Sequence, residues 1–293
     1  MSDPITAVAK AVEKLGRIGE MLLGPRTLRE EAKAKAESIP IVTKAEIASD
    51  DLKVEAHRRR ELEDVRHFTN LAAAFHDAKT QIEFLGAKKL LPENASQGES
   101  DPDWFHKWAG YAKETSDTDI RALWAKVLAG ELVQPGRFSL RLLHCVSLFR
   151  KSEAQNFSLL ANYFCRDQEG RILFLETRRT EDQLLKNVGI GASLFRSLEN
   201  IGLLQRPKEP RGTPLYIQRS TVHYGEHAYT LKMLHVPNPM TSLFVSLNPR
   251  ELTELGEELY ALCEVAPDRE YEKMLFADIL GGEGSGWSVS TLA

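Results

Sequence analysis

Two neighbouring stretches of this chain decide its fold class: WFHKWAGYAK at residues 104–113 and SDTDIRALWAKVLAGE at residues 116–131. In the first, the large aromatic side chains recur at helical spacing and form one stripe. The second opens with Ser116 and Asp119, which have the spacing of a capping box with Asp in place of Glu. A stripe of rings on a helix more often packs into a core than binds a ligand. The two stretches predict a helical bundle whose aromatic core includes Trp104, Phe105, Trp108 and Tyr111.

The bundle is predicted to extend over residues 101–165. Asp101 precedes Pro102, the arrangement of a helix cap followed by proline at the first helical position. Residues 134–136, Gln-Pro-Gly, predict a turn. Further helices are predicted to start at Ser139 and at Ser152, the second running to about Phe164.

An N-terminal helical stalk is predicted over residues 1–90. Apolar residues recur every three or four positions in residues 4–23, and Gly24-Pro25 ends that helix. Residues 44–89 carry a heptad-like seam diluted by alanine, which predicts a helical hairpin or a dimerising stalk. We therefore expect a protein partner, or self-association, through residues 44–89. The seam consists of Leu62, Val65, Thr69, Ala72, Phe75, Ala78, Ile82 and Leu85.

Charged residues flank this seam, beginning with His57-Arg58-Arg59-Arg60. Acidic residues surround the basic run, so a solvated helix face is favoured over a nucleic-acid contact. Residues 91–101, LPENASQGESD, are polar, contain Pro and Gly and show no periodicity. They predict a linker between the stalk and the bundle.

A winged-helix-like α/β module is predicted over residues 166–280, because the pattern changes near residue 170. A strand is expected at 171–176, helices at 180–187 and 191–201, and a hairpin of 216–221 with 227–234 that turns near Gly225. Another strand is expected at 242–247, followed by a helix capped by Asn248-Pro249. The Gly- and Ser-rich tail, 281–293, is predicted to be disordered. The whole chain is thus expected to be mainly α, with the α/β module after the bundle.

Winged helices bind nucleic acid or dock proteins, and both uses are open for this module. The recognition helix of a DNA-binding winged helix normally presents several basic or amide side chains to bases and phosphates. Here the basic residues are sparse, so we favour protein docking and keep nucleic-acid binding as the alternative. The residues that would carry that alternative are Arg196, Arg206, Lys208, Arg211 and Arg219.

Charge and motifs argue against several function classes. The 293 residues include 38 basic and 42 acidic side chains, which is not the balance of a polybasic nucleic-acid or membrane-surface binder. The chain has no GxSxG, HExxH or phosphate-binding glycine loop. We therefore predict no catalytic, cofactor-binding or metal-binding residue and favour a non-enzymatic protein. Three scattered cysteines, no signal sequence and no long apolar run predict a cytoplasmic protein without a membrane span.

The segment 104–154 carries a resemblance as well. With its LWAK motif at residues 123–126, it resembles a bacterial domain-of-unknown-function family, the one numbered twenty-eight hundred and six. More distantly it is similar to the alpha-type abortive-infection proteins of phage defence, which share such a helix, a downstream Pro turn and a late helix like Leu252-Thr-Glu-Leu-Gly256. The resemblance covers roughly residues 100–265 and implies a role in antiviral defence. It carries over no site residue. The resulting expectation is an interaction or sensor protein, with a nucleic-acid-binding regulator as the alternative.

Overall fold

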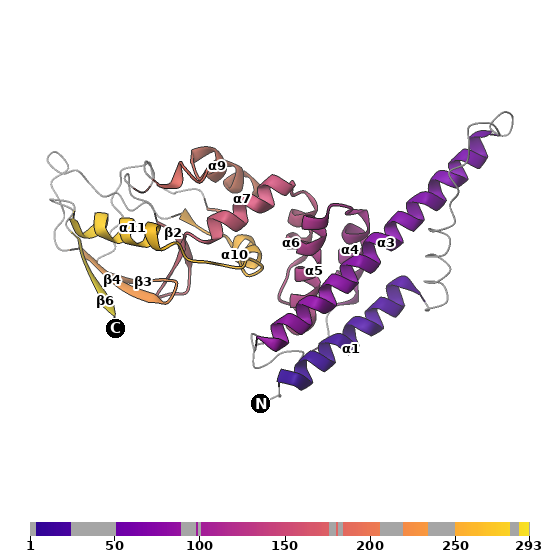
Figure 1. The fold of residues 1–293 in the computed structure, drawn as a ribbon, viewed down its shortest axis with the longest axis horizontal. Coiled ribbons are helices and arrows are strands. Elements are labelled where there is room, and N and C mark those ends of the chain that lie inside the picture. Colours follow the sequence, from indigo (N-terminus) through magenta and orange to yellow (C-terminus); the bar gives the residue numbers. More distant parts are fainter. Residues whose placement is uncertain are drawn as a thin grey trace. The chain divides into compact units, whose positions relative to one another are not determined.

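The protein is mainly helical, with a small antiparallel sheet in its C-terminal part, as the sequence predicts (Figure 1). The computed structural model describes residues 4–24, 51–88, 98, 101–175, 180, 184–205, 219–233, 250–281 and 287–292. By compactness the chain divides into two units, Met1–Leu148 and Phe149–Ala293. The division into stalk, bundle, module and tail stays a prediction about the chain's segments.

The N-terminal unit consists of helices whose ends follow local sequence signals. Asp101 caps α4 by accepting a hydrogen bond from the Asp103 amide at 2.9 Å, as expected for this site. The start of α5 differs by one residue from the expectation, since Asp117, rather than Ser116, accepts from the first turn. Its Oδ1 accepts hydrogen bonds from the Asp119 and Ile120 amides at 2.9 and 3.1 Å. The helices are α1 (Pro4–Leu23), α3 (Asp51–Ala87), α4 (Pro102–Glu114), α5 (Thr118–Val133) and α6 (Leu140–Ser147).

The predicted aromatic core is confirmed. Trp104, Phe105 and Trp108 are buried, whereas Tyr111 is half-buried and stacks on Trp124. Each buried indole N–H has an acceptor: Trp104 donates to the Phe138 carbonyl at 2.8 Å and Trp108 to the Trp124 carbonyl at 3.0 Å. A buried ring with a satisfied N–H adds apolar contact without leaving an unpaired donor in the core.

Helix α3 contributes to this core through its C-terminal part. Phe75 of α3 meets Trp108 of α4 edge to face, with ring centroids 5.4 Å apart. Among the α3 side chains that the structure describes, the buried ones lie from residue 70 onward, and α1 packs on the same helix. The buried residues of α3 are Asn70, Leu71, Ala74, Phe75, Ala78 and Ile82.

The C-terminal unit contains a six-stranded antiparallel sheet among its described residues, in the order β5-β2-β1-β3-β4-β6. The predicted hairpin is confirmed: β3 and β4 pair across a tight turn in which Gly225 has φ +58°. The strands are β1 (Phe164–Asp167), β2 (Ile172–Phe174), β3 (Arg219–Tyr224), β4 (His227–Met233), β5 (Arg250–Glu251) and β6 (Trp287–Leu292). The helices are α7 (Lys151–Ala161), α9 (Ala192–Ile201), α10 (Glu254–Tyr260) and α11 (Arg269–Gly281).

Helix ends and strands of this unit correct four expectations. Helix α7 follows Arg150 and not Ser152, and it ends at Ala161, because Phe164 belongs to β1 and pairs with Phe174. The helix expected after Asn248-Pro249 begins only after Thr253, whose hydroxyl accepts from the Gly256 amide at 3.1 Å. The tail predicted to be disordered contains β6, since its alternation WSVSTL is compatible with an edge strand on β4.

The winged-helix assignment stays a prediction. Its second helix corresponds to α9, and its hairpin to β3 and β4. The helix expected at 180–187 lies partly outside the described residues, and the strand expected at 242–247 lies entirely outside them.

Candidate functional site

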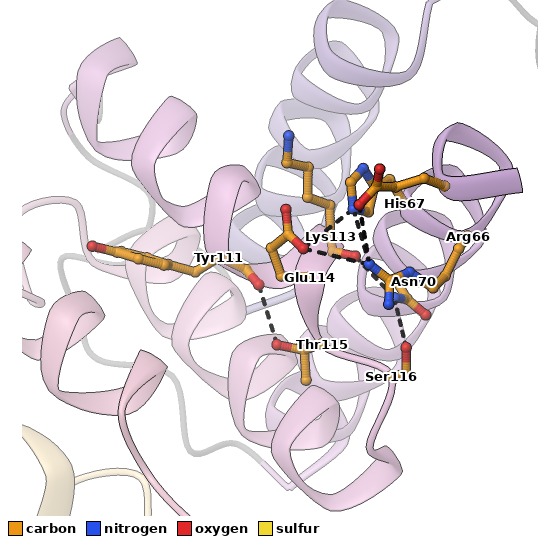
Figure 2. Close-up of polar contacts among 9 residues, drawn as sticks. Arg66, His67, Asn70, Tyr111, Lys113, Glu114, Thr115 and Ser116 are labelled. Atoms are coloured by element: carbon orange, nitrogen blue, oxygen red, sulfur yellow. Dashed lines mark hydrogen bonds and ion pairs between the residues drawn. The ribbon is translucent and has the colours of Figure 1, made fainter. Parts of the chain in front are cut away.

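A polar cluster joins α3 to the end of α4 (Figure 2). Arg66 and His67 both approach Glu114, with Nη2 to Oε2 at 3.6 Å and Nε2 to Oε2 at 3.2 Å. One turn further along α3, Asn70 is buried and points at the last turn of α4. We call Arg66, His67, Asn70 and Glu114 the α3–α4 junction.

Asn70 is the structural centre of this junction. Its side-chain amide donates to the Lys113 carbonyl at 2.8 Å and lies 3.2 Å from the Ser116 hydroxyl oxygen (Figure 2). The last carbonyls of a helix have no partner within that helix, so Asn70 caps α4 from a neighbouring helix. Thr115 ends the same helix by donating its hydroxyl to the Tyr111 carbonyl at 3.1 Å. The junction therefore fixes α4 on α3 at the point where burial of α3 begins.

From residue 57 to residue 69, no side chain of α3 is buried. Leu62 is 42% exposed, and Val65 is half-buried. The sequence explains why burial of α3 stops before Asn70. The buried residues recur every three or four positions, and the same spacing continued from Leu71 toward the N-terminus leads to Asp64 and Glu61. Their carboxylates would be costly to bury without partners. Residues 57–66, which we call the exposed segment, are the first candidate interaction surface.

The exposed segment holds its charges mainly within the helix. Glu55 pairs with Arg59, His57 lies 3.5 Å from Glu61, and Arg66 lies 3.8 Å from Glu63. Such exposed pairs, one turn apart, contribute a few tenths of a kcal/mol each to helix stability. They add a small local contribution to the stability of this part of the helix.

A second polar cluster lies in the C-terminal unit, where α11 packs on the β3–β4 hairpin. Its centre is Glu272, a buried carboxylate. Glu272 Oε1 lies 2.6 Å from His227 Nδ1 and accepts a hydrogen bond from the Tyr229 hydroxyl at 2.8 Å. A buried carboxylate needs such partners, because leaving it unpaired would cost several kcal/mol. We call Glu272, His227 and Tyr229 the Glu272 cluster.

Titration of the neighbouring groups is shifted by this carboxylate and by burial. Burial and the hydrogen bond to Glu272 raise the pKa of Tyr229 to about 12. Burial, reinforced by the same carboxylate, raises the pKa of the Cys165 thiol above its ordinary value. Both causes favour the protonated thiol over the nucleophilic thiolate at Cys165.

Tyr224 ties the hairpin to the end of α7 and to the loop before α11 by hydrogen bonds. Its hydroxyl donates to the Asn162 carbonyl at 2.7 Å and accepts from the Asp268 amide at 2.8 Å. Burial raises its pKa above the ordinary value for tyrosine. The arrangement is that of a structural clasp, because both partners are backbone groups and the ring is buried.

Neither cluster assembles a recognisable reaction centre. Across the described ranges, no group of three or more His, Cys, Asp or Glu side chains is placed to hold a metal ion. Every helix in those ranges is too short or too polar to cross a lipid bilayer. Of the two clusters, only the α3–α4 junction lies next to an exposed apolar residue on a long helix, namely Leu62 of α3. The exposed segment of α3 is therefore the stronger candidate for an interaction surface.

The residues predicted for nucleic-acid binding are only partly placed. Arg196 is exposed on α9, and its Nε donates to the Ala192 carbonyl at 3.3 Å. Arg219 lies in β3, where its Cα is opposite that of Lys232. Arg206, Lys208 and Arg211 lie outside the described residues.

Sequence reasoning missed both Asn70 and the Glu272 cluster. Asn70 meets Lys113 from 43 positions away, and His227 meets Glu272 across 45 positions. No local motif marks such pairs. A buried carboxylate was foreseeable only as an acidic residue on the apolar side of α11, beside Tyr271 and Leu275.

Comparison with known proteins identifies a family and no function. The family described as "Protein of unknown function (DUF2806)" matches residues 56–276, which is more than half of the chain. No curated protein matches, and no solved structure does.

Proposed function

The chain belongs to the family described as Protein of unknown function (DUF2806), and we propose that it is a non-enzymatic interaction protein that self-associates through the exposed part of α3. The observation that carries the proposal is that no side chain from residue 57 to residue 69 is buried, on a helix of 37 residues. Leu62 lies within this stretch, and an exposed leucine beside a half-buried valine gives a partner helix apolar area to cover. The family match begins at residue 56 and so includes the segment.

The test measures the mass of the full chain in solution by light scattering over a range of concentrations. We expect a mass above that of one chain for the wild type and a shift toward the monomer for Leu62→Glu, because a buried charge opposes helix pairing. Leu148→Glu is the matched control, since Leu148 is 66% exposed and lies outside α3. A wild-type protein that remains a monomer at every concentration would contradict the proposal.

We also propose that this self-association serves phage defence. This part of the proposal rests on the resemblance to alpha-type abortive-infection proteins. Expression of the chain in a bacterial host should then lower phage plating efficiency, and Leu62→Glu should restore it. Equal plating with and without the wild-type chain, over a broad phage panel, would remove the defence role and leave self-association standing.

Nucleic-acid binding through the C-terminal unit is the second candidate. It is favoured by one face of α9, on which Ser193, Arg196 and Asn200 are all exposed. Their spacing of three and four residues places them on one side of the helix. A recognition helix uses such polar and basic side chains for bases and phosphates.

Duplex DNA binding measured by fluorescence anisotropy tests this candidate. Affinity should fall steeply as salt rises, and it should fall further in Arg196→Ala and Arg211→Ala. Arg17→Ala is the control, because Arg17 is an exposed arginine of α1. Absence of binding at low salt, or binding unchanged in both variants, would remove this candidate.

A further inference from the structure

We infer that strand β6 pairs with β6 of a second copy of the chain, in antiparallel orientation centred on Val289, so that two sheets join into one. This inference goes beyond the contact through α3 proposed above and does not depend on it. In the described part of the sheet, β6 has a neighbour, β4, on one side only (Figure 1). The backbone groups on the other side of β6 are those that a further strand would bind.

The two ends of the sheet differ in how they are protected from pairing. At the other end, β5 has only two residues, and its outer side is covered, because Leu204 forms a bridge with Leu252 and the Gln205 amide donates to the Glu251 carbonyl at 2.9 Å. Proteins commonly protect an edge strand by shortening it, covering it or charging it. Strand β6 has six residues, Trp-Ser-Val-Ser-Thr-Leu, with neither charge nor proline. Its length and its sequence therefore permit pairing.

The register of the sheet shows which residues of β6 direct their backbone N–H and C=O groups outward. Tyr224 and His227 flank the two-residue turn of the β3–β4 hairpin and so form a hydrogen-bonded pair. Such pairs alternate with non-hydrogen-bonded ones along antiparallel strands, so Thr230 directs its backbone groups away from β3 and toward Ser290 of β6. By the same alternation, the residues whose backbone groups point to the open edge are Trp287, Val289 and Thr291.

The open edge is complementary to itself. In an antiparallel pair centred on Val289, this residue lies opposite Val289 of the second copy, and Trp287 lies opposite Thr291. Every outward-pointing group of one strand then meets an outward-pointing group of the other. Between these positions, Ser288 lies opposite Ser290. Pairs of β-branched residues and pairs of hydroxyl residues favour cross-strand contact, which is why we choose a second copy as the partner.

Helix α11 leaves room for the second sheet. Glu272 and Phe276 of α11 both contact Tyr229, so α11 lies over β4 on one face of the sheet. The two-fold axis of the proposed pair is perpendicular to the sheet and places both α11 helices on the same face. Two β6 strands then separate the β4 strands of the two copies, which puts them about 14 Å apart. Packed helices need only about 8–10 Å between their axes.

The test places charges at Ser288 and Ser290, which lie opposite each other in the proposed pair. Both positions are on the face of the sheet opposite to α11, because they pair with Lys232 and Thr230 of β4 and not with Tyr229. Every chain is full length and also carries Leu62→Glu, so that the proposed contact through α3 does not contribute. The dissociation constant of each variant is measured by sedimentation equilibrium. A contact of one strand is small, so we expect weak pairing that needs high concentration.

Two variants place like charges opposite each other: Ser288→Lys/Ser290→Lys and Ser288→Glu/Ser290→Glu. The matched control is Ser288→Lys/Ser290→Glu, which places opposite charges across the antiparallel pair. Because the control shares Ser288→Lys with the first variant, any effect of that change on β4 through Lys232 appears in both. We expect each like-charge variant to pair about ten-fold more weakly than the control, and an equimolar mixture of the two to pair as the control does.

The other outcomes separate this inference from the contact through α3. Like-charge variants that pair as tightly as the control would overturn the inference, and so would a control that pairs most weakly, which indicates parallel strands. A Leu62→Glu chain that is a monomer at every concentration also overturns it and leaves the contact through α3 standing. A Leu62→Glu chain with the same mass as the wild type counts against α3 instead.

A pair of proline variants keeps the inference testable if the charges disturb β6. Val289→Pro removes an N–H that faces the open edge, whereas Ser290→Pro removes one that faces β4. We expect Val289→Pro to weaken pairing about ten-fold and to lower the unfolding temperature less than Ser290→Pro does. Undiminished pairing of Val289→Pro would contradict the inference.

Discussion

Glu272 is a buried side chain that connects helix α11 to the β3–β4 hairpin. The carboxylate lies on α11, yet its partners, His227 and Tyr229, belong to the hairpin strand β4. Phe276, one turn after Glu272, stacks on the Tyr229 ring with centroids 3.6 Å apart. Polar and aromatic contacts of the same two elements therefore act together to hold α11 on the sheet.

The raised pKa of Tyr229 predicts a loss of stability in alkali. A tyrosine whose folded-state pKa is about 12, above the ordinary value of about 10, favours the folded state while it is protonated. Its contribution is complete below pH 10 and is lost as pH rises through about 12. We expect Tyr229→Phe to flatten the pH dependence of the unfolding temperature in that window, measured by circular dichroism. An unchanged slope would contradict the role of this hydroxyl.

Asn70 makes a comparable connection in the N-terminal unit, and its removal should be costly. Asn70→Ala leaves the Lys113 carbonyl without its side-chain donor and opens a small space between α3 and α4. We expect a loss of about 1–3 kcal/mol in the free energy of unfolding, measured with denaturant. Asn156→Ala, at an exposed position of α7, should change it by less than about 0.5 kcal/mol. Equal effects of the two changes would contradict the capping role.

Packing between elements depends on small residues where α1 meets α3. The buried residues of α1 recur every four positions: Ala7, Ala11, Leu15 and Gly19. Beside this stripe, Val8 of α1 lies against α3, since a Cβ atom added to Gly86 of α3 would meet the Val8 side chain closer than 3.0 Å. Val8 is branched at Cβ and has few rotamers with which to yield.

Two glycine substitutions in this helix pair should therefore have opposite effects. Gly86→Ala should lower the free energy of unfolding by about 1–3 kcal/mol through overpacking. Gly16→Ala, in α1, meets nothing within 4 Å and should raise it by about 0.5–1 kcal/mol, because alanine is the better helix former. Thermal unfolding of both variants would measure this. Stabilisation by Gly86→Ala would show that α1 does not pack as described.

Helices and turns that depend on residues close in sequence could be predicted. Strands that form by pairing with distant strands were harder to predict. The cap at Asp101, the aromatic stripe and the turn at Gly225 are each encoded within a few residues. Strand β1 was missed because residues 164–167 follow a helix without a Gly or Pro between them, and pairing with β2 and β3 makes them a strand. Strand β5 has two residues and exists through its pairing with β2.

The whole chain consists of two compact units, and each has its own buried core. Trp108 and Trp124 lie at the centre of the first, whereas Phe174 and Tyr271 lie at the centre of the second. Phe174 contacts the rings of Phe164, Phe195 and Tyr271, which come from different elements of the same unit. A unit with such a core has the means to fold without its neighbour.

Separate expression of residues 1–148 and 149–293 should give two folded proteins. We expect the first to show a helical circular dichroism spectrum and each to unfold cooperatively with heat. A first segment that unfolds without a transition, while the full chain unfolds with one, would show that its core depends on the second unit.

Local chemistry thus accounts for the helical class of the protein, its caps, its aromatic bundle and the β3–β4 hairpin, because capping, helical periodicity and turn geometry act over about four residues. The sequence also marked residues 44–89 as a seam, but it did not show which half of that seam the bundle covers. The burial of α3 side chains from Asn70 onward, the absence of buried side chains at residues 57–69 and the contact of Glu272 with His227 all depend on how distant parts of the chain pack. Those contacts arise when whole helices and strands pack, a long-range event that no single stretch of residues encodes.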